Sequence, residues 1–215
     1  MVAGSPGDRL PPGPCASRHS HRIHGIHRLT PPLSKGDSPV CALFEPSILA
    51  DAIWQVDLES LKAQGVRGLI LDLDNTLVDW NQDYIRPEVR RWLDAARSLG
   101  MQRSLVSNAI RGARVKRIGA ELDLVVVTWA LKPLPGGFRR AISAMGTAAA
   151  STCAIGDQVF TDILGGKLAG VRTVLLTPLS PRESPHTRLI RLIERPLRRR
   201  WARSGHAPIP PGLRR

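Results

Sequence analysis

The chain has little of several residue types, and each shortage narrows what it can be. Its three cysteines, Cys15, Cys41 and Cys153, are too few and too scattered for a disulfide framework, and no CxxC pair suggests a zinc site. No apolar run reaches the roughly 18 residues that a membrane-spanning helix needs. The first residues also lack the charged-then-apolar order of a secretory signal. These absences predict a protein of the reducing cytoplasm.

Histidine and lysine are scarce as well. Residues 41–178 contain no histidine, which excludes phosphatases with a histidine nucleophile and hydrolases whose paired metals are bound by histidine. Neither cysteine of this stretch is followed by arginine six residues later, so a Cys-x₅-Arg phosphate loop is absent too. Only five of the 31 basic residues are lysine. A lysine in this chain therefore indicates a position that needs a compact ammonium group rather than positive charge alone.

The net charge of +13 is distributed unevenly. Residues 1–40 carry five Lys and Arg against two Asp and Glu, and residues 179–215 carry ten against two, whereas residues 41–178 carry sixteen against fourteen. The basicity therefore belongs to the ends of the chain. We expect a disordered, basic and Pro-rich tail over residues 1–41, a globular domain over 42–184, and an Arg-rich helix and tail over 185–215.

Short apolar runs alternate with helical patterns through the central part. We expect strands at residues 68–73, 103–107, 124–128, 152–155 and 172–176, and helices at about 87–99, 110–120, 136–147 and 160–169. Such alternation predicts an α/β fold, a Rossmann-like three-layer sandwich with a central parallel sheet. In these sheets ligands bind beyond the carboxyl ends of the strands.

Polar residues follow four of the expected strands at that end. They are, in chain order, Asp72, Asp74 and Thr76; Ser107 and Asn108; Lys132; and Asp157 and Asp162. Two carboxylates one residue apart after a buried strand are costly unless a cation lies near them or they take part in chemistry. Singly, these motifs could be a solvated turn or a helix cap. Together they supply what phosphoryl transfer needs: charge neutralisation, an in-line nucleophile and donors for phosphoryl oxygens.

The order of these motifs resembles that of the haloacid dehalogenase (HAD) superfamily, which is DxDxT, then Ser or Thr, then Lys, then GDxxxxD. The resemblance implies an Mg²⁺-dependent phosphomonoester hydrolase in which Asp72 attacks phosphorus and forms an aspartyl phosphate. It implies that Asp74 is the general acid and base. The implied Mg²⁺ ligands are Asp72, Asp74 through its main-chain carbonyl, Asp157 and Asp162. The implied phosphate-binding residues are Thr76, Ser107, Asn108 and Lys132.

The residues around these motifs narrow the resemblance. Over roughly residues 43–195 the chain is similar to the YqeG branch of class III-A HAD phosphatases. That branch is similar to phosphatidylglycerophosphatases, which makes phosphatidylglycerophosphate the candidate substrate. Ala109 departs from the pattern, because many members have Asn there. The intervals from Asp72 to Ser107 (107 − 72 = 35) and from Ser107 to Lys132 (132 − 107 = 25) leave no room for a large cap domain. An open site suits a large or membrane-bound substrate.

The basic C-terminal segment supports a second, non-enzymatic hypothesis. Residues 186–203 place apolar side chains among seven arginines, which is typical of a helix at a membrane surface or an arm that contacts RNA, here interrupted at Pro196. A helix that docks on the domain explains the pattern equally well. Because aromatic residues are scarce, specific nucleic-acid recognition is not expected. The alternative is thus a non-catalytic anion-binding module. For either function, residues 186–203 are a candidate for peripheral contact with the inner membrane surface, and the oligomeric state stays open.

Overall fold

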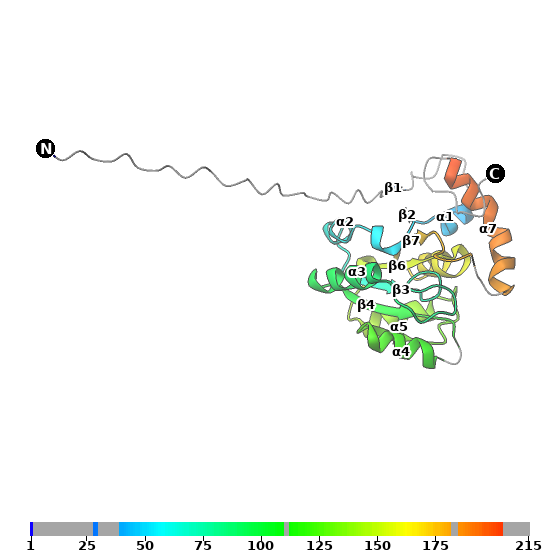
Figure 1. Ribbon diagram of the computed structural model, residues 1–215. Helices are drawn as coiled ribbons and strands as arrows, with labels where there is room; N and C mark the ends of the chain where they lie inside the picture. Colours follow the sequence, from blue (N-terminus) through cyan, green and yellow to red (C-terminus); the bar gives the residue numbers. More distant parts are fainter. Residues whose placement is uncertain (2–27, 30–38, 110–111, 182–184, 204–215) are drawn as a thin grey trace.

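The computed structural model describes residues 1, 28–29, 39–109, 112–181 and 185–203 (Figure 1). A seven-stranded sheet lies at its centre, in the order β1-β2-β7-β6-β3-β4-β5. All neighbouring strands are parallel except β1 and β2, which are antiparallel. The strands are β1 (Arg28–Leu29), β2 (Ile48–Ala50), β3 (Gly68–Leu71), β4 (Gln102–Val106), β5 (Val125–Val127), β6 (Thr152–Gly156) and β7 (Arg172–Leu176).

Helices connect the parallel strands. They are α1 (Pro39–Phe44), α2 (Leu58–Ala63), α3 (Pro87–Ser98), α4 (Ala113–Glu121), α5 (Gly136–Ala144), α6 (Leu164–Leu168) and α7 (Pro185–Arg203). Two 3₁₀ turns, η1 (Ile53–Gln55) and η2 (Ala149–Ser151), and one π-helical turn, η3 (Val159–Ile163), complete the chain order. The connection from β5 to α5 and the connection from β6 to η3 both begin at the carboxyl edge of the parallel sheet.

The sheet is covered on both faces, and the alternation of side chains along β3 shows how. Leu69 and Leu71 are fully buried in a core shared with α2, α3 and α4. Ile70, between them, belongs to a second core on the opposite face, which contains Phe138 and Ala141 of α5. Since successive strand residues point to opposite faces, a continuous apolar run fits a strand buried on both sides. The three-layer α/β fold predicted from the sequence is confirmed.

Helix α3 forms for the reasons visible in its sequence. Pro87 occupies its first turn, where the missing N–H costs nothing, and Gly100 follows its end with a φ of +74° that favours glycine. Val89, Trp92, Leu93 and Ala96 make its buried face. The indole N–H of Trp92 donates to the Val56 carbonyl at 2.8 Å, so the one polar atom of that face is satisfied.

Several details differ from the expectation. β2 and α2 were not expected, because three apolar residues and a single short turn are too brief to stand out as a pattern. β1 and the start of α1 at Pro39 fall inside the segment expected to be a disordered tail. The rest of residues 1–38 lies outside the described residues. The expected interruption at Pro196 is wrong, because α7 runs through this residue as one helix.

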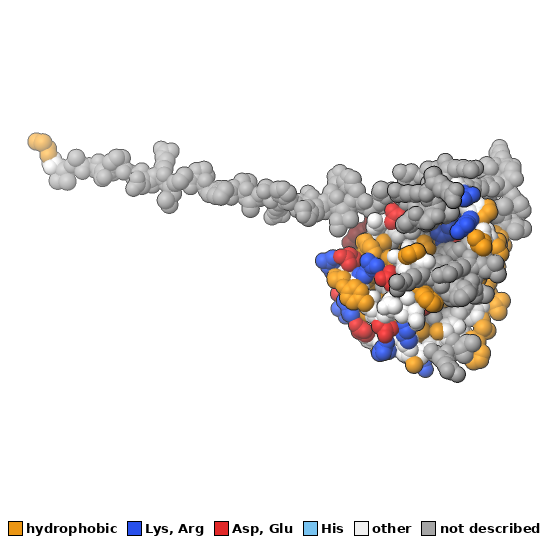
Figure 2. All heavy atoms as spheres, turned by 45° about the vertical axis from the view of Figure 1, so that its right-hand side comes forward, with side chains coloured by type: hydrophobic (Ala, Val, Ile, Leu, Met, Phe, Trp, Pro, Cys, Tyr) orange, Lys and Arg blue, Asp and Glu red, His pale blue; other side chains and the backbone are white. Residues whose placement is uncertain are grey.

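The flap between β3 and α3 is short. An isolated antiparallel bridge joins Val78 to Ile85, and a second bridge joins Val78 to Asp74. Within the described residues no cap domain is inserted here or between β4 and β5. None of the helices described is long and apolar enough to cross a membrane. On the face shown in Figure 2, acidic and basic side chains intermingle over the left-hand part of the domain, as the near-neutral charge of residues 41–178 predicts.

Candidate active site

Asp72 stands at the carboxyl end of the central strand β3. Its N–H still donates to the Ile155 carbonyl of β6 at 3.1 Å, so the ladder fixes its backbone. The chain then turns sharply, and Asn75 adopts a φ of +63° with its N–H bonded to the Val78 carbonyl. Asn tolerates this left-handed conformation better than most residues. The turn leaves the Asp72 carboxylate at the edge of the sheet, where a ligand can reach it.

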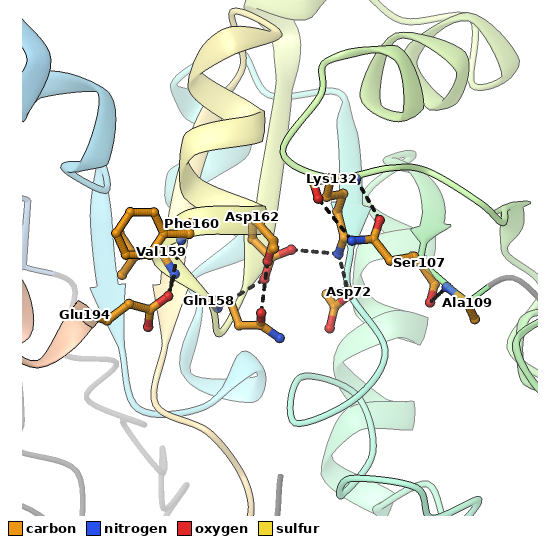
Figure 3. Close-up of polar contacts among 11 residues, drawn as sticks. Asp72, Ser107, Ala109, Lys132, Gln158, Val159, Phe160, Asp162 and Glu194 are labelled. Carbon is orange, nitrogen blue, oxygen red and sulfur yellow. Dashed lines mark hydrogen bonds and ion pairs between the residues drawn. The ribbon is translucent and has the colours of Figure 1, made fainter. Parts of the chain in front are cut away.

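Lys132 joins the acidic groups of two different strand ends. Its ammonium Nζ donates to Asp72 Oδ1 at 2.5 Å and to Asp162 Oδ1 at 2.7 Å (Figure 3). The side chain is buried, and its backbone is held by Asn108. The Lys132 N–H donates to the Asn108 side-chain oxygen at 2.7 Å, and the Asn108 amide donates back to the Lys132 carbonyl at 3.1 Å. Asn108, expected to bind phosphate, thus engages the main chain of the lysine.

Asp157 and Asp162 follow β6, and both are buried. The carboxylate of Asp162 accepts from the Gln158 N–H at 3.1 Å, closing the turn between them. Gly156 is required for this approach, because an added Cβ would lie 2.2 Å from an Asp162 oxygen. Ligand oxygens of Asp72, Asp157 and Asp162 all lie within 4.8 Å of one another. The structure thus brings together three of the four residues that were expected to bind the metal.

The cluster is electrostatically unbalanced. Three carboxylates and one ammonium give a formal charge of −3 + 1 = −2 when all are ionised. Burial raises the pKa of Asp72 to about 8; Lys132 opposes this rise, and Asp162 and Asp157 add to it. Burial alone would lower the pKa of Lys132, but the Asp162 and Asp72 carboxylates outweigh it and raise that pKa. The lysine therefore stays an ammonium, and a divalent cation would balance the remaining charge.

Asp74 points to different partners. Its carboxylate accepts from Arg114 Nη1 at 2.9 Å and from the Asn81 N–H of the flap at 3.0 Å. Arg114 also donates to Asp83 Oδ1 at 2.9 Å and to the Gln82 carbonyl. One arginine of α4 therefore fixes both the second carboxylate of the motif and the flap above it.

Ser107 and Thr76 occupy less accessible places. The Ser107 hydroxyl accepts from the Ala109 N–H at 3.2 Å, and the residue is buried beside Lys132 (Figure 3). Thr76 is fully buried, and its hydroxyl has no hydrogen-bond partner among the described residues. The structure therefore places Ser107 at the end of β4, next to the cluster. It places Thr76 inside the turn that follows Asp74.

Helix α7 contacts the loop that follows β6 and carries Asp157 and Asp162. The sequence did not predict this contact. Glu194 Oε1 accepts from the N–H groups of Val159 at 2.7 Å and Phe160 at 3.2 Å, at the start of η3 (Figure 3). Arg198 pairs with Glu194 Oε2 at 3.3 Å and donates to the main-chain carbonyl of Asp157. Arg198 is buried, which fits the docked helix among the alternatives left open for residues 186–203.

Two sequence signals could have found these residues. Glu194 is the only carboxylate of residues 184–215, set among many arginines and four residues before Arg198. A lone Glu with a basic partner at i+4 indicates a specific pair. For Arg114, the signal is its spacing from Arg117. The two arginines lie one turn apart on the helix that follows Ser107, so both can reach the same acidic residue. The acidic flap residue Asp83 pairs with both arginines.

Comparison with known proteins agrees with this geometry. Residues 43–170 match the family model of the haloacid dehalogenase-like hydrolases. The chain belongs to that family. It is 34% identical over 163 residues to the probable phosphatase YqeG of Bacillus subtilis (strain 168), covering 76% of this chain and 94% of that protein. The HAD resemblance, its YqeG branch and the assignment as a phosphatase are thereby confirmed, and the non-catalytic alternative is not retained.

Two further matches are more distant. The chloroplastic/mitochondrial phosphatidylglycerophosphate phosphatase 1 of Arabidopsis thaliana is 29% identical over 173 residues, covering 76% of this chain and 50% of that protein. Among solved structures, the cobalt-bound deoxy-D-mannose-octulosonate 8-phosphate phosphatase of Haemophilus influenzae matches with a TM-score of 0.45 and 17% identity. That match covers 54% of this chain and 70% of the other. The chain thus spans half the length of the plant relative.

Proposed function

We propose that this phosphatase hydrolyses a phosphomonoester through an aspartyl phosphate on Asp72, with Mg²⁺ as its cofactor. The observation that carries the proposal is the contact of Lys132 Nζ with Asp72 at 2.5 Å inside a cluster of three carboxylates. A cation held at this distance orients the attacking carboxylate and offers a donor to the incoming phosphoryl oxygens. The compact ammonium suits this position because one nitrogen atom contacts both Asp72 and Asp162.

The chemistry divides into two steps. In the first, a carboxylate oxygen of Asp72 bonds to phosphorus, the ester P–O bond breaks, and Asp74 gives its proton to the leaving oxygen. In the second, Asp74 takes a proton from water as the water oxygen bonds to phosphorus. The P–O bond to Asp72 then breaks, which releases inorganic phosphate and restores the Asp72 carboxylate and the protonated Asp74. Ser107 lies beside Lys132 and serves as a further donor to the phosphoryl group.

The residues present fit Mg²⁺. Oxygen ligands are those that this ion prefers, and Asp72, Asp157 and Asp162 bring three carboxylates within 4.8 Å. Their formal excess of two negative charges over Lys132 matches a divalent cation. The ligands we propose are these carboxylates, with the main-chain carbonyl of Asp74. When bound, the ion would neutralise charge on the phosphoryl oxygens.

The proposed substrate is phosphatidylglycerophosphate. Two relatives carry phosphatidylglycerophosphate phosphatase in their names, from Arabidopsis thaliana and Chlamydomonas reinhardtii. The short flap supports the assignment, because a headgroup attached to a bilayer needs an active site without a domain above it.

Asp72→Asn tests the nucleophile. It keeps the shape of the side chain and removes the attacking charge, so turnover should fall at least about a thousandfold, or about 4 kcal/mol of barrier. Asp74→Asn should also lose turnover but accumulate phosphate on Asp72, because attack can precede the step that needs a base. Mass spectrometry after acid quench would detect that adduct. A fall of less than tenfold for Asp72→Asn would contradict the covalent route.

Removal of the metal tests the cofactor. EDTA should abolish hydrolysis of both p-nitrophenyl phosphate and phosphatidylglycerophosphate, and Mg²⁺ should restore it. Ca²⁺ should restore little, because it takes more ligands at longer distances. Full activity after exhaustive chelation would rule out the metal site, whereas activity on the soluble ester alone would rule out only the lipid substrate.

A further inference from the structure

Large apolar side chains are exposed beside the catalytic lysine. Trp129, Leu131 and Leu134 are 56%, 55% and 59% exposed, although their neighbour Lys132 is buried. All three lie in the loop between β5 and α5. We call these three residues the apolar rim. Single exposed apolar residues need no explanation, but three within six positions around an active-site residue form a local surface.

The backbone of the rim is unfavourable for the side chains it carries. Trp129 has a φ of +49° and Leu131 a φ of +54°, in the left-handed region that favours Gly, Asn and Asp. Each such residue costs on the order of 1 kcal/mol. Holding Lys132 in place explains the backbone, but it does not explain why the side chains are Trp and Leu. Asn at either position would ease the strain, so the apolar choice indicates a use outside the fold.

Hydrogen bonds fix the main chain of the loop that carries these side chains. The Trp129 N–H donates to the Ala109 carbonyl at 3.3 Å, and Arg140 donates to the Trp129 carbonyl at 2.8 Å. The Leu134 N–H donates to the Leu131 carbonyl at 2.9 Å. Because these bonds fix the main chain of the loop, little backbone entropy is left to lose when the rim is covered.

Basic side chains follow the rim along the chain. Residues 124–156 contain no Asp or Glu, and Arg139 and Arg140, one turn into α5, are exposed. An apolar surface with cations at its border matches an anionic bilayer, in which apolar side chains enter the interface and arginines meet headgroup phosphates. Tryptophan favours that interface because its ring is apolar and its N–H is polar.

We propose that the apolar rim inserts into the interface of an anionic bilayer and so delivers a lipid phosphate to Asp72. This inference rests on the proposed lipid substrate and gives it a docking surface. The proposal assigns the membrane contact to the rim rather than to residues 186–203, in which Glu194 and Arg198 bind the loop after β6. Because Lys132 belongs to the same loop as the rim, a lipid headgroup held there would lie near the active site.

The test compares the rim with an equally exposed apolar pair elsewhere. The rim variant carries Trp129→Asn, Leu131→Asn and Leu134→Asn. The control carries Leu192→Asn and Ile193→Asn on α7, which are 52% and 61% exposed. Binding is measured by co-sedimentation in EDTA with vesicles of phosphatidylglycerol and phosphatidylcholine. These lipids carry no phosphomonoester, so the result does not depend on turnover.

The rim variant should bind these vesicles at least about tenfold more weakly than the wild type, and the control should bind within about twofold of it. Both should hydrolyse p-nitrophenyl phosphate at the wild-type rate, which also reports that they fold. Leu134→Asn alone, at an ordinary backbone position, provides a milder variant. Equal binding by the rim variant and the wild type, or an equal loss in the control, would overturn the proposal. A rim variant that changes oligomeric mass but not vesicle binding would instead make the rim an interface between copies.

Discussion

The catalytic carboxylates are supported in two opposite ways. On the flap side, Asp74 is held by Arg114, and the two side chains are 37% and 24% exposed. On the metal side, the loop after β6 is held by Glu194 and Arg198, which are 0% and 9% exposed. The first pair lies in a high effective dielectric and the second in a low one. The same chemistry, an arginine beside a carboxylate, therefore has different consequences on the two sides.

The difference in burial between the two pairs corresponds to the proposed roles of the carboxylates that they support. The metal ligands need a fixed geometry, and a buried pair that also bonds three main-chain groups supplies it. In the proposed mechanism Asp74 exchanges a proton with two different oxygens, so a partly solvated ion pair that leaves its side chain adjustable is suitable. Exposed pairs contribute about 0–1 kcal/mol, whereas breaking a buried one costs about 3–5 kcal/mol.

The largest effect is expected for Glu194→Ala. It removes the buried carboxylate that accepts from two N–H groups of η3 and that pairs with Arg198, so the free energy of unfolding should fall by about 3–5 kcal/mol. The apparent affinity for Mg²⁺ should fall as well, because the Asp157 loop loses its support. Urea unfolding in EDTA gives the first quantity, and calorimetric titration of the folded variant with Mg²⁺ gives the second.

Two matched variants sharpen this result. Glu194→Gln keeps an oxygen for the N–H groups but removes the charge that faces Arg198, and it should lie between Ala and the wild type. Ile193→Ala, on the exposed side of the same helix, should change neither quantity by more than about 0.5 kcal/mol. If the folded Glu194→Ala protein bound Mg²⁺ with wild-type affinity, α7 would contribute to the stability of the fold but not to the metal site.

A smaller effect on stability is expected for Arg114→Gln, although its effect on turnover should be clear. The free energy of unfolding should change by less than about 1 kcal/mol, because the pairs it breaks are partly solvated. The kcat should fall roughly tenfold, since Asp74 and the flap lose their common partner. Mg²⁺ affinity should be unchanged. Steady-state kinetics with p-nitrophenyl phosphate would measure this.

Arg117→Gln is the control for that variant. Arg117 is one turn further along α4 and pairs with Asp83 but not with Asp74. Its removal should leave kcat within about twofold of the wild type. A similar loss in both variants would mean that the flap as a whole matters, and that the contact with Asp74 does not.

This contrast also explains what the sequence could predict. The strands around the site were predictable because Asp72, Ser107 and Asp157 each come at the end of a short run that includes apolar residues. The convergence of those residues follows from the parallel sheet alone. The role of Asn108 was not predictable, because the same Ser-Asn pair could donate to phosphate or to a neighbouring loop. Only the position of the Lys132 main chain decides between these.

The supports were harder to predict because they join distant segments. Glu194 meets the Val159 N–H across 35 residues, and Arg114 meets Asp74 across 40. No local period records such contacts. The composition of residues 186–203 left a docked helix and an exposed basic helix equally open, and it is the pair of Arg198 with Glu194 that docks this part of α7. Tertiary pairing decided between them.

The smallest effect is expected for Asp83→Asn at the tip of the flap. Hydrogen bonds from Arg114, with further contacts from Arg117, hold the pKa of Asp83 below its ordinary value of about 3.9. A carboxyl whose pKa is lower in the folded state stabilises the fold above its unfolded pKa, and this contribution is lost as the pH falls through the folded value. The wild type should therefore exceed Asp83→Asn in urea midpoint at pH 7 and pH 5. The two midpoints should converge below about pH 3.9.

Because the pair is exposed, about 1 M salt at pH 7 should remove the same difference. A gap between the midpoints that persists at low pH and at high salt would mean that Asp83 acts through shape rather than charge, and the contrast between the two supports would lose its electrostatic basis.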